Sequence, residues 1–168
     1  MNSFYQIPAG TQIGHVHLKV ADLDRSLDFY CGLLGFQLMT TYGKDAAFIS
    51  AGGYHHHIGL NTWMSKGGNP PPANATGLFH TAILLPTRKD LAVILQRLRE
   101  AKYPISGASD HGVSEALYLN DPDENGVELY VDRPKEDWPI HEDGSLDMFT
   151  KPLDLRDLLD ELEPLHPN

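Results

Sequence analysis

Histidine and glutamate residues stand in this sequence where they could bind a divalent metal. His15 and His80 each lie in a short run of alternating polar and apolar residues. Glu128 lies in a third run, GVELYV, and alternation places it on the face opposite Val127 and Leu129. Two imidazoles and one carboxylate are typical of non-haem Fe(II) sites, and they also tolerate Mn(II). The pattern predicts one metal centre formed by these three residues.

An internal repeat relates the two histidines. A βαβββ pattern at about residues 12–63 recurs at about 78–134, and His15 and His80 hold equivalent positions in the two copies. The strands are expected at 13–20, 36–43, 45–53 and 54–63, and again at 78–86, 103–110, 115–122 and 126–134. We therefore predict an α+β fold in which two βαβββ modules form a cupped mixed sheet. Its pseudo-twofold symmetry would place both histidines on the walls of a shared cup.

Each proposed ligand also has an ordinary structural explanation. A histidine in a strand is more often a hydrogen-bonded structural residue than a ligand. Glu128 alone could be an exposed residue of an edge strand. The coincidence of two histidines at equivalent points of a repeat, with a carboxylate facing the same way, favours the metal site.

Length and composition restrict the other classes of function. The 168 residues suit one domain, expected at 1–134, followed by a tail at 135–168 that contains an amphipathic helix at 153–163. The net charge of −10 argues against nucleic acid and anionic lipid as partners. The single cysteine excludes an intramolecular disulfide, and no apolar run is long enough to span a bilayer. The start, MNSFYQIPAGTQ, lacks the features of a secretory signal, so a cytoplasmic location is expected.

Three segments together resemble the vicinal oxygen chelate superfamily, which includes glyoxalase I, bleomycin-resistance proteins and type I extradiol dioxygenases. They are GHVHLKVADLDRSLDFYCGLLGF, LFHTAILLP and DPDENGVELY, and the resemblance covers about residues 12–134. It implies the vicinal oxygen chelate fold. It also implies that His15, His80 and Glu128 are the metal ligands.

Within this superfamily, the sequence is most similar to the catechol 2,3-dioxygenase branch. The strand region 48–63 contains no acidic residue, whereas glyoxalase I-like enzymes carry a glutamate ligand there. The resemblance implies that His56 is the acid/base residue, that Tyr118 contacts the substrate and that His111 is a further active-site histidine. It predicts an Fe(II)-dependent extradiol dioxygenase that acts on a catechol-type aromatic diol with O2.

Two alternatives on the same fold remain open at this point. One is a metal-dependent glyoxalase or thiol-transferase type of enzyme, and the other is a metal-free protein that binds aromatic drugs. Most type I extradiol enzymes have four modules and this chain has two, so a homodimer or the tail is expected to close the cavity. Alternation predicts that His55 and His57 face away from His56, and hydrogen bonds across strands are expected for them. His17 shares the face of His15 further along the strand, where it is expected to fill space, with support of a metal ligand as the alternative.

Overall fold

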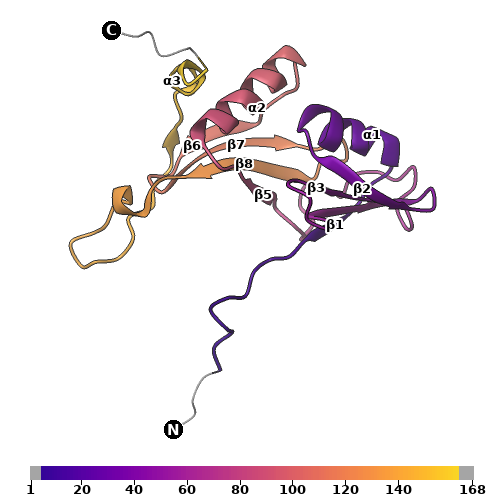
Figure 1. The fold of residues 1–168 in the computed structure, drawn as a ribbon, viewed down its shortest axis with the longest axis horizontal. Coiled ribbons are helices and arrows are strands. Elements are labelled where there is room, and N and C mark those ends of the chain that lie inside the picture. The colour runs from indigo at the N-terminus through magenta and orange to yellow at the C-terminus, as the bar shows by residue number, and fades with distance from the viewer. Residues whose placement is uncertain (1–4, 163–168) are drawn as a thin grey trace. The chain divides into compact units, whose positions relative to one another are not determined.

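The structure is a computed structural model, and residues 5–162 are described. These residues form two compact units (Figure 1). One unit comprises the chain up to Leu23 together with Phe36–Gly68. The other comprises Asp24–Gly35 and the chain from Asn69 onward.

The first unit contains a four-stranded mixed sheet in the order β1-β4-β3-β2. Its first strand runs parallel to β4, and the remaining pairs are antiparallel. The alternation expected for the first strand is confirmed, because Leu18 and Val20 are buried while His17 and Lys19 are exposed. The strands are β1 (Val16–Lys19), β2 (Gln37–Tyr42), β3 (Ala46–Ser50) and β4 (Ile58–Asn61).

The second unit contains a five-stranded sheet in the order β5-β8-β7-β6-β9. β5 runs parallel to β8, and the other pairs are antiparallel. Val127, Leu129 and Val131 are buried, whereas Glu128 is only partly buried, so β8 has one core face and one open face as the sequence predicts. The strands are β5 (Thr81–Leu84), β6 (Gly107–Asp110), β7 (Ser114–Asn120), β8 (Gly126–Asp132) and β9 (Lys151–Pro152).

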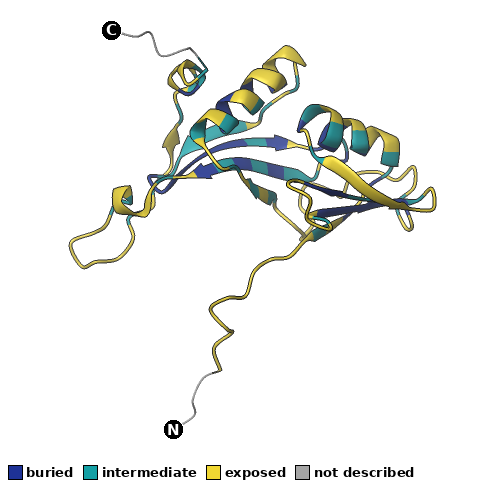
Figure 2. Ribbon diagram, in the orientation of Figure 1, coloured by how far each residue is buried: buried dark blue, intermediate teal, exposed yellow. Residues whose placement is uncertain are grey.

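Helix α2 (Arg88–Glu100) covers the core face of this sheet (Figure 2). Thr87 caps its N-terminus, since the Thr87 side chain accepts a hydrogen bond of 3.1 Å from the backbone N–H of Asp90. Leu91 and Leu95 are fully buried along one stripe of the helix. The helix therefore begins directly after its capping threonine, and the apolar stripe explains why the helix packs on β8.

The first helix consists of α1 (Leu23–Leu27) followed by a π-helix (Asp28–Leu33). Apart from Leu23, it belongs to the second unit. The Tyr30 hydroxyl donates a 3.0 Å hydrogen bond to the buried carboxylate of Asp121, in the turn after β7. Arg97 of α2 donates to two backbone carbonyls at the end of the π-helix, at 2.8 and 2.9 Å. This helix therefore docks on the β7–β8 turn and on α2.

The tail adds a strand and a helix to the second unit. β9 pairs with the edge of β6, and α3 (Leu155–Asp160) packs against α2 with Leu158 fully buried. The amphipathic tail helix is thus confirmed over part of its predicted length, while residues 163–168, including His166, lie outside the described residues. None of the described helices is both long enough and apolar enough to cross a membrane.

The observed order of elements confirms the predicted fold class. Each module reads strand, helix and three strands, followed by a tail with a short 3₁₀-helix (Lys135–Asp137), β9 and α3. The division into one domain at 1–134 and a tail stays a prediction.

One buried polar atom yields a stability prediction. Among the described residues, the Thr81 hydroxyl is the one buried side-chain polar group that lacks a hydrogen-bond partner. Burial of an unpaired hydroxyl costs roughly 1–3 kcal/mol, so T81V, which keeps the shape, is expected to raise the free energy of unfolding by about 1 kcal/mol. Urea unfolding measures this change. T81S is the control, because it keeps the hydroxyl, loses the methyl group and should unfold more easily. A T81V variant less stable than the wild type would contradict the prediction.

Candidate metal site

His80 and Glu128 come together on the open face of the second sheet. His80 directly precedes β5, and Glu128 lies on β8 opposite Ala82 in the parallel register. The Nε2 atom of His80 lies 2.9 Å from Oε2 of Glu128, and their side chains are 31% and 13% exposed. Two donors about 2.1 Å from one metal and at a right angle would be roughly 3.0 Å apart. The pair therefore fits two neighbouring coordination positions.

The third predicted ligand belongs to the other unit. His15 immediately precedes β1 and is exposed. Within residues 5–162, no three His, Cys, Asp or Glu side chains gather closely enough to hold a metal ion. The structure thus brings together the pair formed by His80 and Glu128, and the participation of His15 stays a prediction.

Tyr118 supports the Glu128 carboxylate. The two residues are direct cross-strand partners on β7 and β8, so their side chains share the open face. The Tyr118 hydroxyl donates a 3.0 Å hydrogen bond to Oε1 of Glu128, the oxygen that His80 does not contact. Burial, with the hydrogen bond to Glu128, raises the pKa of Tyr118 to about 12. Tyr118 therefore keeps its proton near neutral pH and acts as a hydrogen-bond donor.

His111 extends this chain of hydrogen bonds. It lies in the β6–β7 turn, and its Nε2 is 2.7 Å from the Tyr118 hydroxyl. The turn is tight, because Gly112 has a φ of 78° and its backbone N–H donates a 2.8 Å hydrogen bond to the carboxylate of Asp110. The predicted residues His80, Glu128, Tyr118 and His111 therefore form one connected group in the second unit.

The start of β5 approaches β8 closely at Gly126. A Cβ on this glycine would lie 2.1 Å from the Phe79 carbonyl oxygen and 3.1 Å from Cα of His80. Neither distance leaves room for a side chain. Gly126 therefore allows the backbone that carries His80 to lie against β8, where Glu128 is two residues away.

In the first unit, His56 lies beside His15. Their ring centroids are 4.4 Å apart. Partial burial, and after it the neighbouring imidazoles beginning with His15, lower the pKa of His56. His56 is therefore neutral near pH 7 and can accept a proton.

The expectation that His55 faces away from His56 is wrong. β4 begins only at Ile58, so the three histidines precede the strand, and the Nδ1 atoms of His55 and His56 lie 2.7 Å apart. Gly52 and Gly53 both have positive φ, and the turn they form ends strand geometry before the histidines.

The other two histidines have structural roles. His57 matches its expectation, because its Nδ1 lies 2.9 Å from the Ser50 hydroxyl across the sheet. The His17 ring covers Gly59, whose absent Cβ would lie 2.9 Å from it, and it packs against the ring of Trp63. His17 therefore fills space, as expected.

Sequence reasoning missed three contributors to the second-unit site. Gly126 supplies the close backbone approach, and its place as the first residue of GVELYV was a usable signal. Phe149 and Thr150 contact His111 Nδ1 from the tail, at 3.1 Å for the Phe149 carbonyl oxygen and 3.2 Å for the Thr150 hydroxyl. No sequence signal marked these two residues.

Comparison with known proteins agrees with this fold. A model of the Glyoxalase/Bleomycin resistance protein/Dioxygenase superfamily matches residues 12–129, and the chain belongs to this superfamily. It is 42% identical over 156 residues to the catechol-2,3-dioxygenase of Bacillus subtilis (strain 168), which covers 90% of this chain and 52% of that protein. It is 32% identical over 128 residues to biphenyl-2,3-diol 1,2-dioxygenase 2 of Rhodococcus globerulus, covering 74% and 64% of the two chains. The chain thus spans about half to under two thirds of these relatives' length.

Solved structures support the same fold. A glyoxalase/dioxygenase from Nostoc punctiforme matches with a TM-score of 0.62 and 19% identity, over 79% of this chain and all of that one (100%). A glyoxylase/bleomycin resistance protein/dioxygenase domain from Frankia sp. EAN1pec matches with a TM-score of 0.61 and 25% identity, over 73% and 98% of the chains.

Proposed function

We propose that the protein is an Fe(II)-dependent extradiol dioxygenase that cleaves a catechol-type aromatic diol with O2. The observation that carries this proposal is the placement of His80 Nε2 2.9 Å from Glu128 Oε2, with the Tyr118 hydroxyl on the other carboxylate oxygen. The similarity to the Bacillus and Rhodococcus dioxygenases over most of this chain supports it.

His80, Glu128 and His15 are the proposed metal ligands. The donor set contains two imidazoles and one carboxylate without a thiolate, which suits Fe(II) and leaves open positions for small molecules; Mn(II) also suits it. Iron bound there would supply the redox chemistry with O2. The acidic chain, with a net charge of −10, does not repel an uncharged diol.

Three residues of the chain are proposed to handle protons and hydrogen bonds. His56 would accept a proton from a substrate hydroxyl, because its lowered pKa keeps the imidazole neutral. Tyr118 keeps its own proton and orients the Glu128 carboxylate by donating to it. His111 would hold the Tyr118 hydroxyl in place through the contact of its Nε2 with that oxygen at 2.7 Å.

The direct test is oxygen consumption by the iron-loaded protein. The full chain is loaded with Fe(II) without oxygen, mixed with a panel of catechols and then exposed to air. We expect O2 uptake and a yellow ring-opened product. Near-stoichiometric metal without O2 uptake across the panel would overturn the proposal. Glutathione-dependent turnover with Ni(II) or Zn(II) would favour the glyoxalase alternative, and less than about a tenth of an equivalent of metal would favour the binding protein.

The pH dependence of kcat/KM tests the role of His56. Because its pKa lies below the ordinary value of about 6.5, the neutral base persists below that pH and is lost only as the pH falls further. Activity should therefore decline on the acid side below about pH 6.5. H56N is expected to lower kcat/KM by about 100-fold and to abolish that acid limb. H141N, at an exposed loop histidine, should preserve both. An unchanged acid limb in H56N would contradict the role.

A further inference from the structure

The tail contributes two polar groups to the hydrogen-bond chain that ends at Glu128. The Nδ1 atom of His111 faces the Phe149 carbonyl oxygen at 3.1 Å and the Thr150 hydroxyl at 3.2 Å. The backbone N–H of Phe149 donates a 3.3 Å hydrogen bond to the backbone carbonyl of His111. The tail therefore touches both the ring and the backbone of this histidine.

The hydrogens of this chain can be assigned from the partners. Tyr118 has one hydroxyl hydrogen, and an ionised Glu128 can only accept, so that hydrogen points to Oε1 at 3.0 Å. The Tyr118 oxygen must then accept from Nε2 of His111 at 2.7 Å, which places a hydrogen on Nε2. In the neutral ring Nδ1 is consequently bare and needs a donor.

Thr150 is the donor that Nδ1 needs. Its hydroxyl can donate to a bare Nδ1, whereas the Phe149 carbonyl can only accept. If the Thr150 hydroxyl is removed, an Nδ1 without a hydrogen faces the Phe149 carbonyl oxygen, and neither atom can donate a hydrogen bond. The tautomer with a hydrogen on Nδ1 then becomes favourable, because Nδ1–H can donate to that carbonyl oxygen. On this assignment, the Thr150 hydroxyl would determine which nitrogen of the His111 ring carries the hydrogen.

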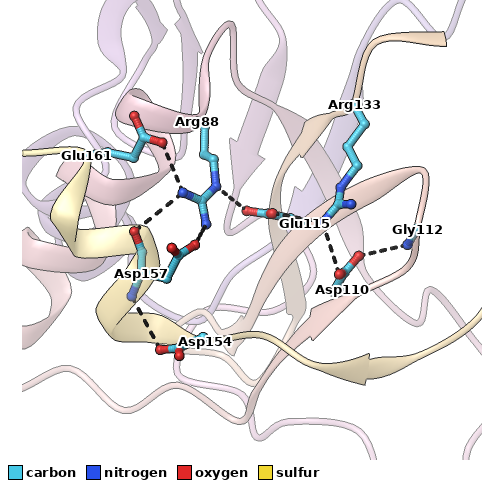
Figure 3. Close-up of polar contacts among 8 residues, drawn as sticks. All are labelled: Arg88, Asp110, Gly112, Glu115, Arg133, Asp154, Asp157 and Glu161. Carbon is cyan, nitrogen blue, oxygen red and sulfur yellow. Dashed lines mark hydrogen bonds and ion pairs between the residues drawn. The ribbon is translucent and has the colours of Figure 1, made fainter. Parts of the chain in front are cut away.

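The tail segment that follows Thr150 is fixed by strand pairing and by ion pairs, and Figure 3 shows the ion pairs. Directly after it, Lys151 of β9 pairs with Asp110 at the edge of β6. Further along, Arg88 at the start of α2 binds Asp157 of α3 at 2.5 Å, Glu161 at 2.9 Å and the buried Glu115 of β7 at 2.7 Å. These contacts hold α3 on the unit that carries His111.

The His111 turn is fixed from its other side. Arg133 binds Asp110 and Glu115, both at 3.0 Å. Gly112 leaves space for the Phe149 ring, because a Cβ there would lie 2.7 Å from Cε1 of that ring. The contact between the tail and His111 is therefore made by two anchored segments.

We propose that Thr150 is a positioning residue that holds His111 in the Nε2–H tautomer, so that Tyr118 keeps its hydrogen bond to Glu128. The tail is then part of the site, since it sets the direction of the hydrogen-bond chain that orients a proposed metal ligand. The expected effect of Thr150 on catalysis rests on the proposed function, whereas its effect on the His111 tautomer does not.

Nitrogen-15 NMR of the His111 ring in the metal-free full chain tests the proposal, at about pH 8 where an ordinary imidazole is neutral. We expect Nδ1 to be unprotonated in the wild type. T150S keeps the hydroxyl and should show the same pattern, whereas T150V should show a protonated Nδ1. A protonated Nδ1 in the wild type, or one pattern in all three proteins, would overturn the proposal.

A kinetic measurement separates this proposal from the proposed function. In the iron-loaded protein T150V should lower kcat by about 10-fold, and T150S should restore it, because outer partners of metal ligands typically contribute 10–100-fold. Should the tautomers follow the prediction while no variant consumes O2, the proposed function fails and the role of Thr150 in setting the tautomer stands. Equal kcat in T150V and T150S would remove its role in positioning the site.

Discussion

Replacement of Glu128 by glutamine is expected to abolish metal binding and the proposed oxygenase activity while the fold remains intact. The amide keeps the shape of the side chain and still accepts from Tyr118, but it loses the negative charge that a divalent cation requires. Outer partners of a metal ligand contribute 10–100-fold, so loss of the ligand itself should lower kcat/KM on the order of 1000-fold. The change isolates the charge of one carboxylate.

Metal analysis and thermal unfolding measure the two halves of this prediction. Protein loaded with Fe(II) without oxygen should hold about one equivalent in the wild type and far less in E128Q. E100Q is the matched control, because Glu100 is exposed on α2 and its hydrogen bond from Gln96 at 2.8 Å can persist with an amide. Full iron occupancy in E128Q would show that Glu128 is not a ligand.

The sequence could predict the second-unit site to the extent that strand alternation determines it. GVELYV places Glu128 on the open face of β8 because every second residue of the strand is buried in the core. The pairing of Tyr118 with Glu128 follows from the length of the turn between β7 and β8. Without knowledge of the β7–β8 register, strand alternation could not single out Tyr118, and only the family resemblance did so.

Strand alternation gave a wrong orientation for His55 because this residue lies before β4 and not in it. His55 and His56 looked like strand residues, but the preceding glycines with positive φ delay the start of β4 to Ile58. The contact of Thr150 with His111 was also unpredictable, because the residues are 39 apart and meet through a two-residue strand. A strand that short has no periodicity to detect.

The repeat predicted where the first helix lies in the sequence, but not which unit the helix packs in. The βαβββ pattern predicts a helix between the strands expected at 13–20 and 36–43, and the structure has α1 and the π-helix there, followed by Gly35 at a φ of 91°. Yet residues 24–35 belong to the unit formed by the second module. The reason lies in long-range polar contacts, such as that of Tyr30 with Asp121, which hydrophobic periodicity does not encode.

Alanine at Gly126 is expected to displace His80 and to weaken metal binding even though it adds one methyl group. The new Cβ would lie 2.1 Å from the Phe79 carbonyl oxygen, so the backbone before β5 must move away from β8. Overpacking of a rigid region typically costs 1–3 kcal/mol, and we expect a loss of about 3 kcal/mol in the free energy of unfolding because backbone is involved. Iron affinity should fall by about 100-fold, because the two ligands lose their 2.9 Å spacing.

Gly107 provides the matched control for this substitution, since it lies in the same sheet on β6. A Cβ there would meet only Cδ2 of Tyr118, at 3.8 Å, which is an ordinary contact. G107A should therefore bind iron as the wild type does and unfold at a similar urea concentration. Urea unfolding and anaerobic iron titration compare the two variants. If G126A binds iron with wild-type affinity, the close approach of β5 to β8 does not position His80, and the pair would owe its geometry to the metal rather than to the sheet.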